Sequence, residues 1–332
     1  MSPKDCGEYR QAAGAGAEAL RVARWHADPM AIKRMSIVDS VKALARPIVA
    51  RALTLLSPNQ RFSLAIRLLD RLPPKASQTM FLTAAAAPRK QLYDELKHAT
   101  GRKIQDGPFK GMRLPDIDAF GWDRDHVPKL LGFYEAELHT AIYHTLAQNH
   151  DCVVNVGCGD GYYAVGYALS LATAKIFAFD TDPGAQKLCR ACAEENGVLD
   201  RVQVGGSIDA FMLQNLLVKW KKPLLLVDCE GCEFYLMRPD SVPQLRYASF
   251  IVECHNFAQP KIVSTLVERF RETHKITLIS EGPRNPNCSK FLRNRHSLLR
   301  WLAVLESRSE AMEWLWGTPL SESVSSDSGT QP

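Results

Sequence analysis

An apolar segment that runs directly into three closely spaced glycines constrains this chain more than any other feature. Residues 153–156 are Val-Val-Asn-Val, and residues 157–161 are Gly-Cys-Gly-Asp-Gly. The apolar run predicts a buried strand, and the glycines let the backbone approach a ligand closely because they carry no Cβ. The segment therefore predicts a strand, a ligand-binding turn and a helix at the start of an α/β domain.

Further short apolar runs follow this segment and alternate with helical patterns. The predicted strands are 176–179, 202–204, 224–227, 250–252 and 276–279. One helix between them is expected to begin at Asp182-Pro183, an N-cap followed by a proline, and to end at Asn196-Gly197. Strands that alternate with helices predict βαβ units and a mostly parallel, doubly wound sheet.

The remainder of the chain divides by composition. Outside the main domain, strand and helix patterns no longer alternate, and the C-terminal end is rich in serine. We expect a poorly structured extension (1–35), a helical N-terminal region (36–100), a β-hairpin with a lead-in helix (101–150), the main α/β domain (151–317) and a disordered tail (318–332). Met30 and Met35 are alternative starts of translation.

Charge and hydropathy exclude several classes of protein. The 332 residues are 46% hydrophobic and 23% charged, with a net charge of +5. This charge is not gathered into the basic stripe that nucleic-acid binding leaves, so no nucleic acid is expected as a partner. No apolar run reaches the roughly 18–20 residues of a membrane span, and no secretory signal precedes the domain. We expect a cytoplasmic enzyme. The stretch 36–70, which is rich in basic residues, either forms helices that cover the enzyme or makes a peripheral membrane contact.

Nine scattered cysteines indicate reduced thiols rather than a disulfide framework. Two pairs have the Cys-x-x-Cys spacing, Cys189 with Cys192 and Cys229 with Cys232. The first pair falls inside a predicted helix, and the spacing between the pairs does not suit a zinc site. We expect all four to be small core residues.

Ligand-type side chains follow four of the predicted strands. Besides the glycine loop, Asp180 follows the second strand, 228–233 (Asp-Cys-Glu-Gly-Cys-Glu) the fourth, and 253–255 (Glu-Cys-His) the fifth. The carboxyl ends of parallel strands meet at one edge, where ligands bind, and Asp180 is placed to hold ribose hydroxyls. The shifted pattern Gly-x-Gly-x-x-Ala over 159–164 also satisfies a dinucleotide motif, so an NAD(P)-dependent oxidoreductase stays an alternative.

Together these segments resemble FkbM-like class I S-adenosylmethionine-dependent methyltransferases. The D-x-E-G-x-E motif at 228–233 and the E-x-H motif at 253–255 carry the resemblance, which covers about residues 103–293. Two departures are Asn155, where an acidic residue is commoner, and the cysteines within 228–233. The resemblance implies a Rossmann-like, seven-stranded, mostly parallel sheet with a helical N-terminal extension, and S-adenosyl-L-methionine as cofactor.

The resemblance also implies roles for individual residues at the cofactor. The glycines at 157, 159 and 161 would lie against the methionine and ribose parts, and Asp180 would bind the ribose. Asp209 would accept a hydrogen bond from the adenine, although a role as N-cap of the next helix is an equal alternative. The cofactor-binding residues expected are Asn155, Gly157, Gly159, Gly161, Asp180 and Asp209.

The expected reaction is O-methylation of a small-molecule or sugar hydroxyl by in-line methyl transfer. Asp228, Glu230 and His255 are the candidate bases for the hydroxyl proton. Glu233 is expected to have a structural role in the first turn of the next helix. No metal is required, but a divalent ion would bind Asp228, Glu253 and His255. A catalytically silent nucleotide-binding protein is the remaining alternative.

Overall fold

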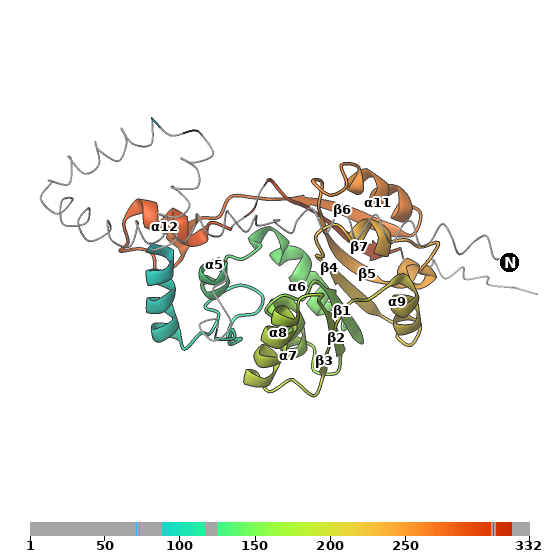
Figure 1. The fold of residues 1–332 in the computed structure, drawn as a ribbon, viewed down its shortest axis with the longest axis horizontal. Helices are drawn as coiled ribbons and strands as arrows, with labels where there is room; N and C mark the ends of the chain where they lie inside the picture. The colour runs from blue at the N-terminus through green and yellow to red at the C-terminus, as the bar shows by residue number, and fades with distance from the viewer. Residues whose placement is uncertain are drawn as a thin grey trace, which may run out of the picture. The chain divides into compact units, whose positions relative to one another are not determined.

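Seven strands form one sheet, and its order brings the predicted ligand-binding ends together (Figure 1). The computed structural model describes residues 71, 73, 88–116, 125–306, 308 and 310–320. The chain divides into two compact units, Met1–Met80 and Phe81–Pro332, and every element below lies in the second. The predicted extension 1–35 and the basic stretch 36–70 lie outside the described residues. None of the described helices has the length and apolar character to cross a bilayer.

The sheet has the order β3-β2-β1-β4-β5-β7-β6. The first five strands pair in parallel, whereas β7 lies antiparallel between β5 and β6. This confirms the expected seven-stranded, mostly parallel sheet. The strands are β1 (Cys152–Val156), β2 (Lys175–Phe179), β3 (Val202–Gly205), β4 (Pro223–Val227), β5 (Ser249–Cys254), β6 (His274–Ser280) and β7 (Glu313–Pro319).

Helices cover both faces of the sheet. Successive β1 side chains point to opposite faces, so both faces are apolar and need to be covered. Val153 packs into the core cluster under α7 and α8, and Val154 into the cluster under α9 and α11 (Figure 1). Residues 88–100 are also helical. The helices are α5 (His126–Leu131), η2 (Ala136–Leu138), α6 (His139–Ala147), α7 (Tyr162–Ser170), α8 (Pro183–Glu195), α9 (Ala210–Leu217), α10 (Glu233–Leu236), η3 (Pro243–Tyr247), α11 (Ile262–Phe270), η4 (Pro286–Cys288) and α12 (Ser297–Val304).

The predicted boundaries of α8 are confirmed. The Asp182 side chain accepts a hydrogen bond from the Gly184 N–H at 2.8 Å, and Pro183 occupies the first helical position. At the other end Asn196 caps the helix and Gly197 has φ +68°. These local signals were sufficient because each satisfies backbone groups that the helix itself leaves unpaired.

Two expected segments differ in the structure. The hairpin expected around Asp106-Gly107 is reduced to one bridge between Lys103 and Arg113, because glycines at positive φ bend the chain into successive turns. The tail expected to be disordered from residue 318 overlaps β7, which continues to Pro319, and residues 321–332 lie outside the described residues. The buried side chains of Trp314 and Leu315 anchor this strand.

Candidate functional site

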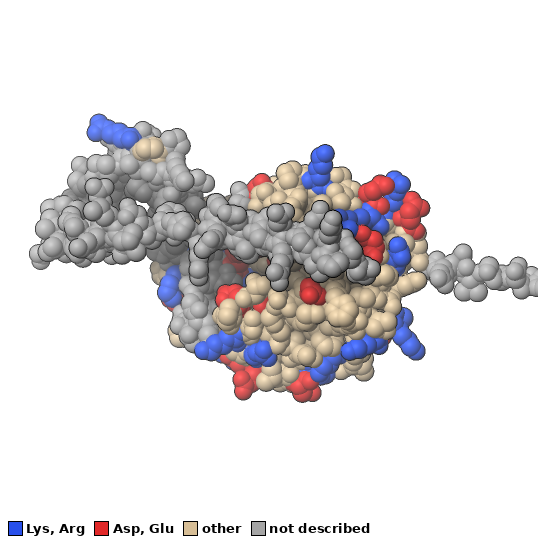
Figure 2. All heavy atoms as spheres, turned by 45° about the vertical axis from the view of Figure 1, so that its right-hand side comes forward, with Lys and Arg blue, Asp and Glu red and all other residues tan. Residues whose placement is uncertain are grey.

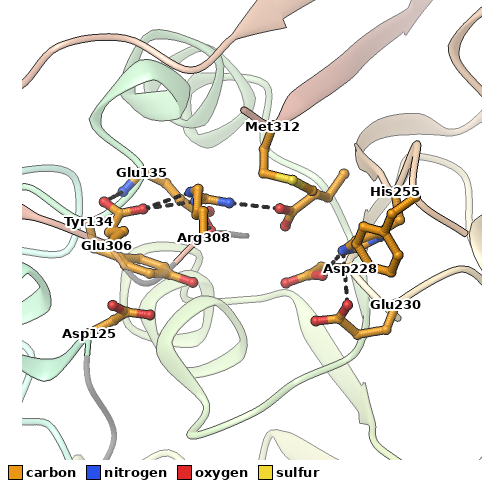
Figure 3. A pocket seen from close by; sticks show the side chains of 11 residues that line it. Asp125, Tyr134, Glu135, Asp228, Glu230, His255, Glu306, Arg308 and Met312 are labelled. Carbon is orange, nitrogen blue, oxygen red and sulfur yellow. Dashed lines mark hydrogen bonds and ion pairs between the residues drawn. The ribbon is translucent and has the colours of Figure 1, made fainter. Parts of the chain in front are cut away.

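A cavity of about 180 Å³ opens beside the carboxyl ends of β4 and β5 (Figure 3). Asp228 directly follows β4, and His255 directly follows β5. Carboxylates dominate the lining, and Arg308 is the one guanidinium among the lining residues. The cavity is lined by Asp125, Tyr134, Glu135, Asp228, Glu230, Glu253, His255, Phe257, Glu306, Arg308 and Met312.

The glycine loop joins β1 to α7 and touches the loop that carries Asp228. Gly157 has φ +80°, and a Cβ built on it would lie 1.5 Å from the Asp228 carbonyl oxygen. Only glycine therefore permits the β1 and β4 ends to approach this closely. Nothing among the described residues lies within 4 Å of a Cβ built on Gly159, so the middle of the loop faces open space.

Asp180 lies against the same loop, as the sequence predicted. Its Oδ2 accepts a hydrogen bond from the Gly159 N–H at 2.9 Å, and its Oδ1 accepts one from the Asp182 N–H at 2.9 Å. The carboxylate is thus held at the end of β2 beside the open face of the glycines. This places the predicted ribose-binding group next to the predicted cofactor loop.

Two other predicted cofactor residues have protein partners. The Asp209 carboxylate accepts a hydrogen bond from the Met212 N–H at 2.8 Å and caps α9, so the alternative role weighed for it is present. Asn155 is buried in β1 and lines a smaller cavity with Asp228 and Glu253. Its Oδ1 has no hydrogen-bond partner among the described residues. The contacts of both residues with a cofactor stay predictions.

The three predicted bases meet in the cavity, beside the ends of β4 and β5. His255 Nε2 lies 3.5 Å from Asp228 Oδ1 and 3.5 Å from Glu230 Oε2 (Figure 3). The His255 side chain is only 3% exposed, whereas that of Glu230 is 77% exposed. The imidazole is therefore fixed in the wall, and the Glu230 carboxylate reaches it from the solvent side.

Glu233 holds this arrangement together, which sequence reasoning did not anticipate. It begins α10 as expected, but its buried carboxylate lies 2.8 Å from His255 Nδ1. It also accepts hydrogen bonds from the N–H groups of Cys229 and Gly231, both at 2.8 Å. A carboxylate only accepts, so Nδ1 carries a proton, and in the neutral ring the lone pair lies on Nε2, which faces the cavity. The last acid of the D-x-E-G-x-E motif was the available signal.

Arg308 organises the opposite wall and carried no local sequence signal. Its guanidinium lies 2.7 Å from Glu253 Oε1, 2.8 Å from Glu306 Oε2 and 3.2 Å from Glu135 Oε1 (Figure 3). It also stacks 4.7 Å from the Trp314 ring centre. Glu135 and Glu253 lie far along the chain from Arg308, so only the fold brings these groups together.

Crowding of acids shifts the protonation of the site. Burial raises the pKa of Asp228, and the charge of Glu135 raises it further. Burial also raises the pKa of Glu253, with Asp228 and Glu135 adding to the effect and Arg308 opposing it. Burial lowers the pKa of His255, but the hydrogen bond and charge of Glu233 more than offset this, so the net shift is upward.

The same groups form a potential set of metal ligands. One donor atom from each of Asp228, Glu253 and His255 lies within 4.8 Å of the other two. Carboxylate oxygens with one imidazole nitrogen suit a divalent transition ion such as Mn²⁺. The structure thus brings together the three residues that the sequence proposed as optional ligands.

The expectation that every thiol is reduced is wrong at Cys229 and Cys232, which form a disulfide. Glu230 and Gly231 between them have φ +56° and +113°, and this tight turn brings the two Cα atoms to 5.5 Å. Cys189 and Cys192 of α8 are free and buried, as expected. The same Cys-x-x-Cys spacing thus forms a disulfide in the turn and leaves two free thiols in the helix.

A buried ion pair supports the glycine loop from behind. Lys129 of α5 donates to Asp160 Oδ2 at 2.9 Å, and the two side chains are 8% and 5% exposed. Asp160 Oδ1 in turn accepts a hydrogen bond from the N–H of Tyr162, the first residue of α7. Asp160 therefore connects the loop, the following helix and the lead-in segment.

Comparison with known proteins finds similarity over one part of the domain, residues 137–221. Residues 137–221 match the model of the ribosomal protein L11 methyltransferase family (PrmA). A ribosomal protein L11 methyltransferase of Acinetobacter baumannii (strain AYE) is 47% identical over 53 residues, which are 16% of this chain and 17% of that relative. The match thus spans about a sixth of the relative's length. The segment 137–221 contains the glycine loop, Asp180 and Asp209, and it ends before Asp228.

Solved methyltransferase structures show a distant similarity to part of this chain. An O-methyltransferase of Streptomyces achromogenes involved in tomaymycin synthesis, in complex with SAM, has a TM-score of 0.35 and 12% identity, covering 53% of this chain and 77% of that one. A B. subtilis tRNA methyltransferase has a TM-score of 0.35 and 9% identity, covering 52% of this chain and 63% of that one.

Proposed function

We propose that this chain, which carries a class I methyltransferase domain, transfers the methyl group of S-adenosylmethionine to a hydroxyl of a small molecule or sugar. The FkbM-like subfamily is part of the proposal. The observation that carries it is the contact between the two loops: Gly157 and Asp228 belong to neighbouring strand ends that only a glycine allows to meet. A cofactor on the glycine loop would present its methyl group beside Asp228 and His255.

The cofactor half supports S-adenosylmethionine as the ligand. The match to methyltransferases covers the glycine loop and Asp180, and the open face of Gly159 leaves room for a bound group. Asp180 would exchange backbone partners for ribose hydroxyls. An NAD(P)-dependent oxidoreductase has the support of the shifted glycine pattern alone, so the methyltransferase is preferred.

The acceptor half supports removal of a hydroxyl proton. Methyl transfer from a sulfonium is an in-line displacement, so the protein mainly orients the reactants and takes the proton. His255, held by Glu233 in the tautomer with a free Nε2, is the preferred base, and Asp228 and Glu230 lie beside it. A placed base contributes roughly a 10²–10⁴-fold acceleration. No metal ion is needed for this step.

The charge of the cavity favours a neutral, polar acceptor over a polyphosphate. Its lining is mostly carboxylates, and its one guanidinium is already paired with three of them. On the face shown in Figure 2, described Lys and Arg side chains are spread among Asp and Glu side chains instead of forming a basic stripe. RNA and protein, the acceptors named for several similar enzymes, are therefore the competing outcomes of the test.

The test is transfer of label from S-adenosyl-[methyl-³H]methionine into a fractionated cell extract. We expect radioactivity in the small-molecule fraction, with stoichiometric S-adenosylhomocysteine, and loss of both in His255→Ala. Label in RNA or protein would replace the acceptor class. Cofactor binding without S-adenosylhomocysteine in any fraction would favour the silent binding protein.

A further inference from the structure

The disulfide between Cys229 and Cys232 lies within the loop that carries two of the candidate bases. Asp228 precedes the first cysteine, and Glu230 stands between the two. Cys232 is exposed and Cys229 half-buried, so a reductant from solvent can reach the bond. Methyl transfer itself makes no use of a disulfide.

The disulfide fixes a turn whose backbone is otherwise unfavourable. Glu230 adopts φ +56°, in the left-handed region that is unfavourable for a non-glycine residue because its Cβ crowds the following carbonyl oxygen. The turn is held by the disulfide around it, by the hydrogen bonds from the Cys229 and Gly231 N–H groups to Glu233, and by one from the Cys232 N–H to the Cys229 carbonyl oxygen at 3.5 Å. Loss of the disulfide leaves the turn with the hydrogen bonds alone.

This turn positions side chains against the candidate base. Glu230 Oε2 and Asp228 Oδ1 each lie 3.5 Å from His255 Nε2. Since Glu230 is largely exposed and touches no wall of the cavity except His255 in the described contacts, its place is set mainly by its own backbone. Movement of the turn would displace the Glu230 carboxylate first and Asp228 second.

We propose that Cys229 and Cys232 form a reversible thiol–disulfide site that controls turnover by positioning Glu230 and Asp228, with the disulfide form the more active. The consequence for turnover rests on the proposed function, whereas the redox site itself does not. The reductant is a dithiol. Cofactor affinity should change little, because Asp180 and the open face of the glycine loop at Gly159 follow β2 and β1, and only Gly157 touches the backbone that precedes the disulfide turn.

The exchange balances as a two-electron reduction. A thiolate of the dithiol attacks Sγ of the exposed Cys232, the Cys229–Cys232 bond breaks, and Cys229 leaves as a thiolate that takes a proton. The second thiol of the reductant then attacks the mixed disulfide and releases Cys232. The protein gains two thiols, and the dithiol becomes a disulfide.

The chain contains matched internal controls. Cys189 and Cys192 have the same spacing but are free and buried in α8, and Cys288 is free and exposed. Cys288 therefore reports the reactivity of an exposed cysteine without a partner, and Cys189 with Cys192 that of a buried pair with the same spacing. Both can be compared with the disulfide-bonded pair at Cys229 and Cys232.

The experiment compares the full chain after air oxidation and after dithiothreitol, with alkylation of unfolded protein, amide hydrogen exchange, calorimetry with S-adenosylmethionine, and turnover. In the oxidised protein we expect Cys229 and Cys232 to resist alkylation until reduced. Reduction should speed exchange of the Cys229 and Gly231 amides but not of α8. It should lower turnover about 10-fold or more, since a 1 Å misplacement can cost about 100-fold, and leave cofactor affinity within about twofold.

Variants complete the test. The double variant Cys229→Ser, Cys232→Ser should have the reduced rate and ignore dithiothreitol, whereas Cys288→Ser should respond like the parent. Alkylation of both cysteines in oxidised protein, or equal exchange and equal turnover in both states, would overturn the proposal. If no form turns over, the proposed function fails, and alkylation with amide exchange still decides whether the redox site exists.

Discussion

Glu233 Oε1 lies 2.8 Å from Nδ1 of His255, and both side chains are buried. This contact connects the helix start after β4 with the end of β5. It selects the tautomer with Nε2 free, and it raises the pKa of His255 above its ordinary value of about 6.5. Glu233 is thus a positioning residue, since it acts through His255.

Turnover should depend on pH with a sign set by this contact. The base form of His255 is neutral, so turnover rises as pH increases through its raised pKa and is lost below it. Glu233→Gln removes the charge, so the pKa of His255 should fall and the rising limb should move to lower pH. The maximal rate should also drop, because the ring is less firmly oriented.

A pH profile of kcat for Glu233→Gln and the parent checks this prediction. Glu268→Gln, an exposed carboxylate of α11, is the control and should keep the parental profile. If kcat of Glu233→Gln rises over the same pH range as kcat of the parent, the positioning role is contradicted.

The Lys129–Asp160 ion pair should stabilise the fold as well as the glycine loop. Removing one partner of a buried pair typically costs about 3–5 kcal/mol. We expect Asp160→Asn to lose stability of this order and to bind S-adenosylmethionine more weakly, as measured by urea unfolding and calorimetry. Asp94→Asn, which removes the exposed pair with Lys90, should cost about 0.5 kcal/mol or less. Equal losses in the two variants would contradict the prediction.

Two glycines of the cofactor loop should respond differently to alanine. In Gly157→Ala the new Cβ would overlap the Asp228 carbonyl oxygen, so the protein should unfold at markedly lower denaturant concentration. In Gly159→Ala the Cβ meets no atom of the described residues within 4 Å, so only the positive φ costs stability, about 1–2 kcal/mol. Its main effect should be weaker cofactor binding. A Gly159→Ala protein with parental affinity would show that the cofactor lies elsewhere.

Chelation should leave the reaction intact. The account assigns proton removal to His255, so dialysis against EDTA should change turnover by less than about twofold, within the scatter expected when no group of the site is lost. A loss of tenfold or more that Mn²⁺ restores would instead assign Asp228, Glu253 and His255 as metal ligands.

The groups at the ends of the parallel strands could be predicted because their signals are local. The glycines, Asp180 and the acids of 228–233 each follow an apolar strand directly, and parallel strands bring their ends to one edge. The caps of α8 were equally readable, since they depend on residues at the helix ends themselves.

The opposite wall could not be predicted, because its groups meet only through tertiary packing. Glu135 and Glu253 lie far from Arg308 in the sequence, and Arg308 follows a helix with no motif. The disulfide depended on the backbone angles of Glu230 and Gly231, which spacing alone does not reveal. Strand β7 was not predicted, because the residues around Trp314 and Trp316 show no clear alternation of apolar and polar side chains and lie close to a serine-rich end.

The most direct test separates the two halves of the site by calorimetry with S-adenosylmethionine and a turnover assay on Asp180→Ala and His255→Ala. Asp180→Ala should weaken cofactor binding about tenfold or more, because hydrogen bonds to a charged group contribute roughly 1.5–3 kcal/mol. His255→Ala should bind the cofactor within about twofold of the parent and lose about 10²–10⁴-fold in turnover. Parental cofactor affinity in Asp180→Ala, or parental turnover in His255→Ala, would contradict the account.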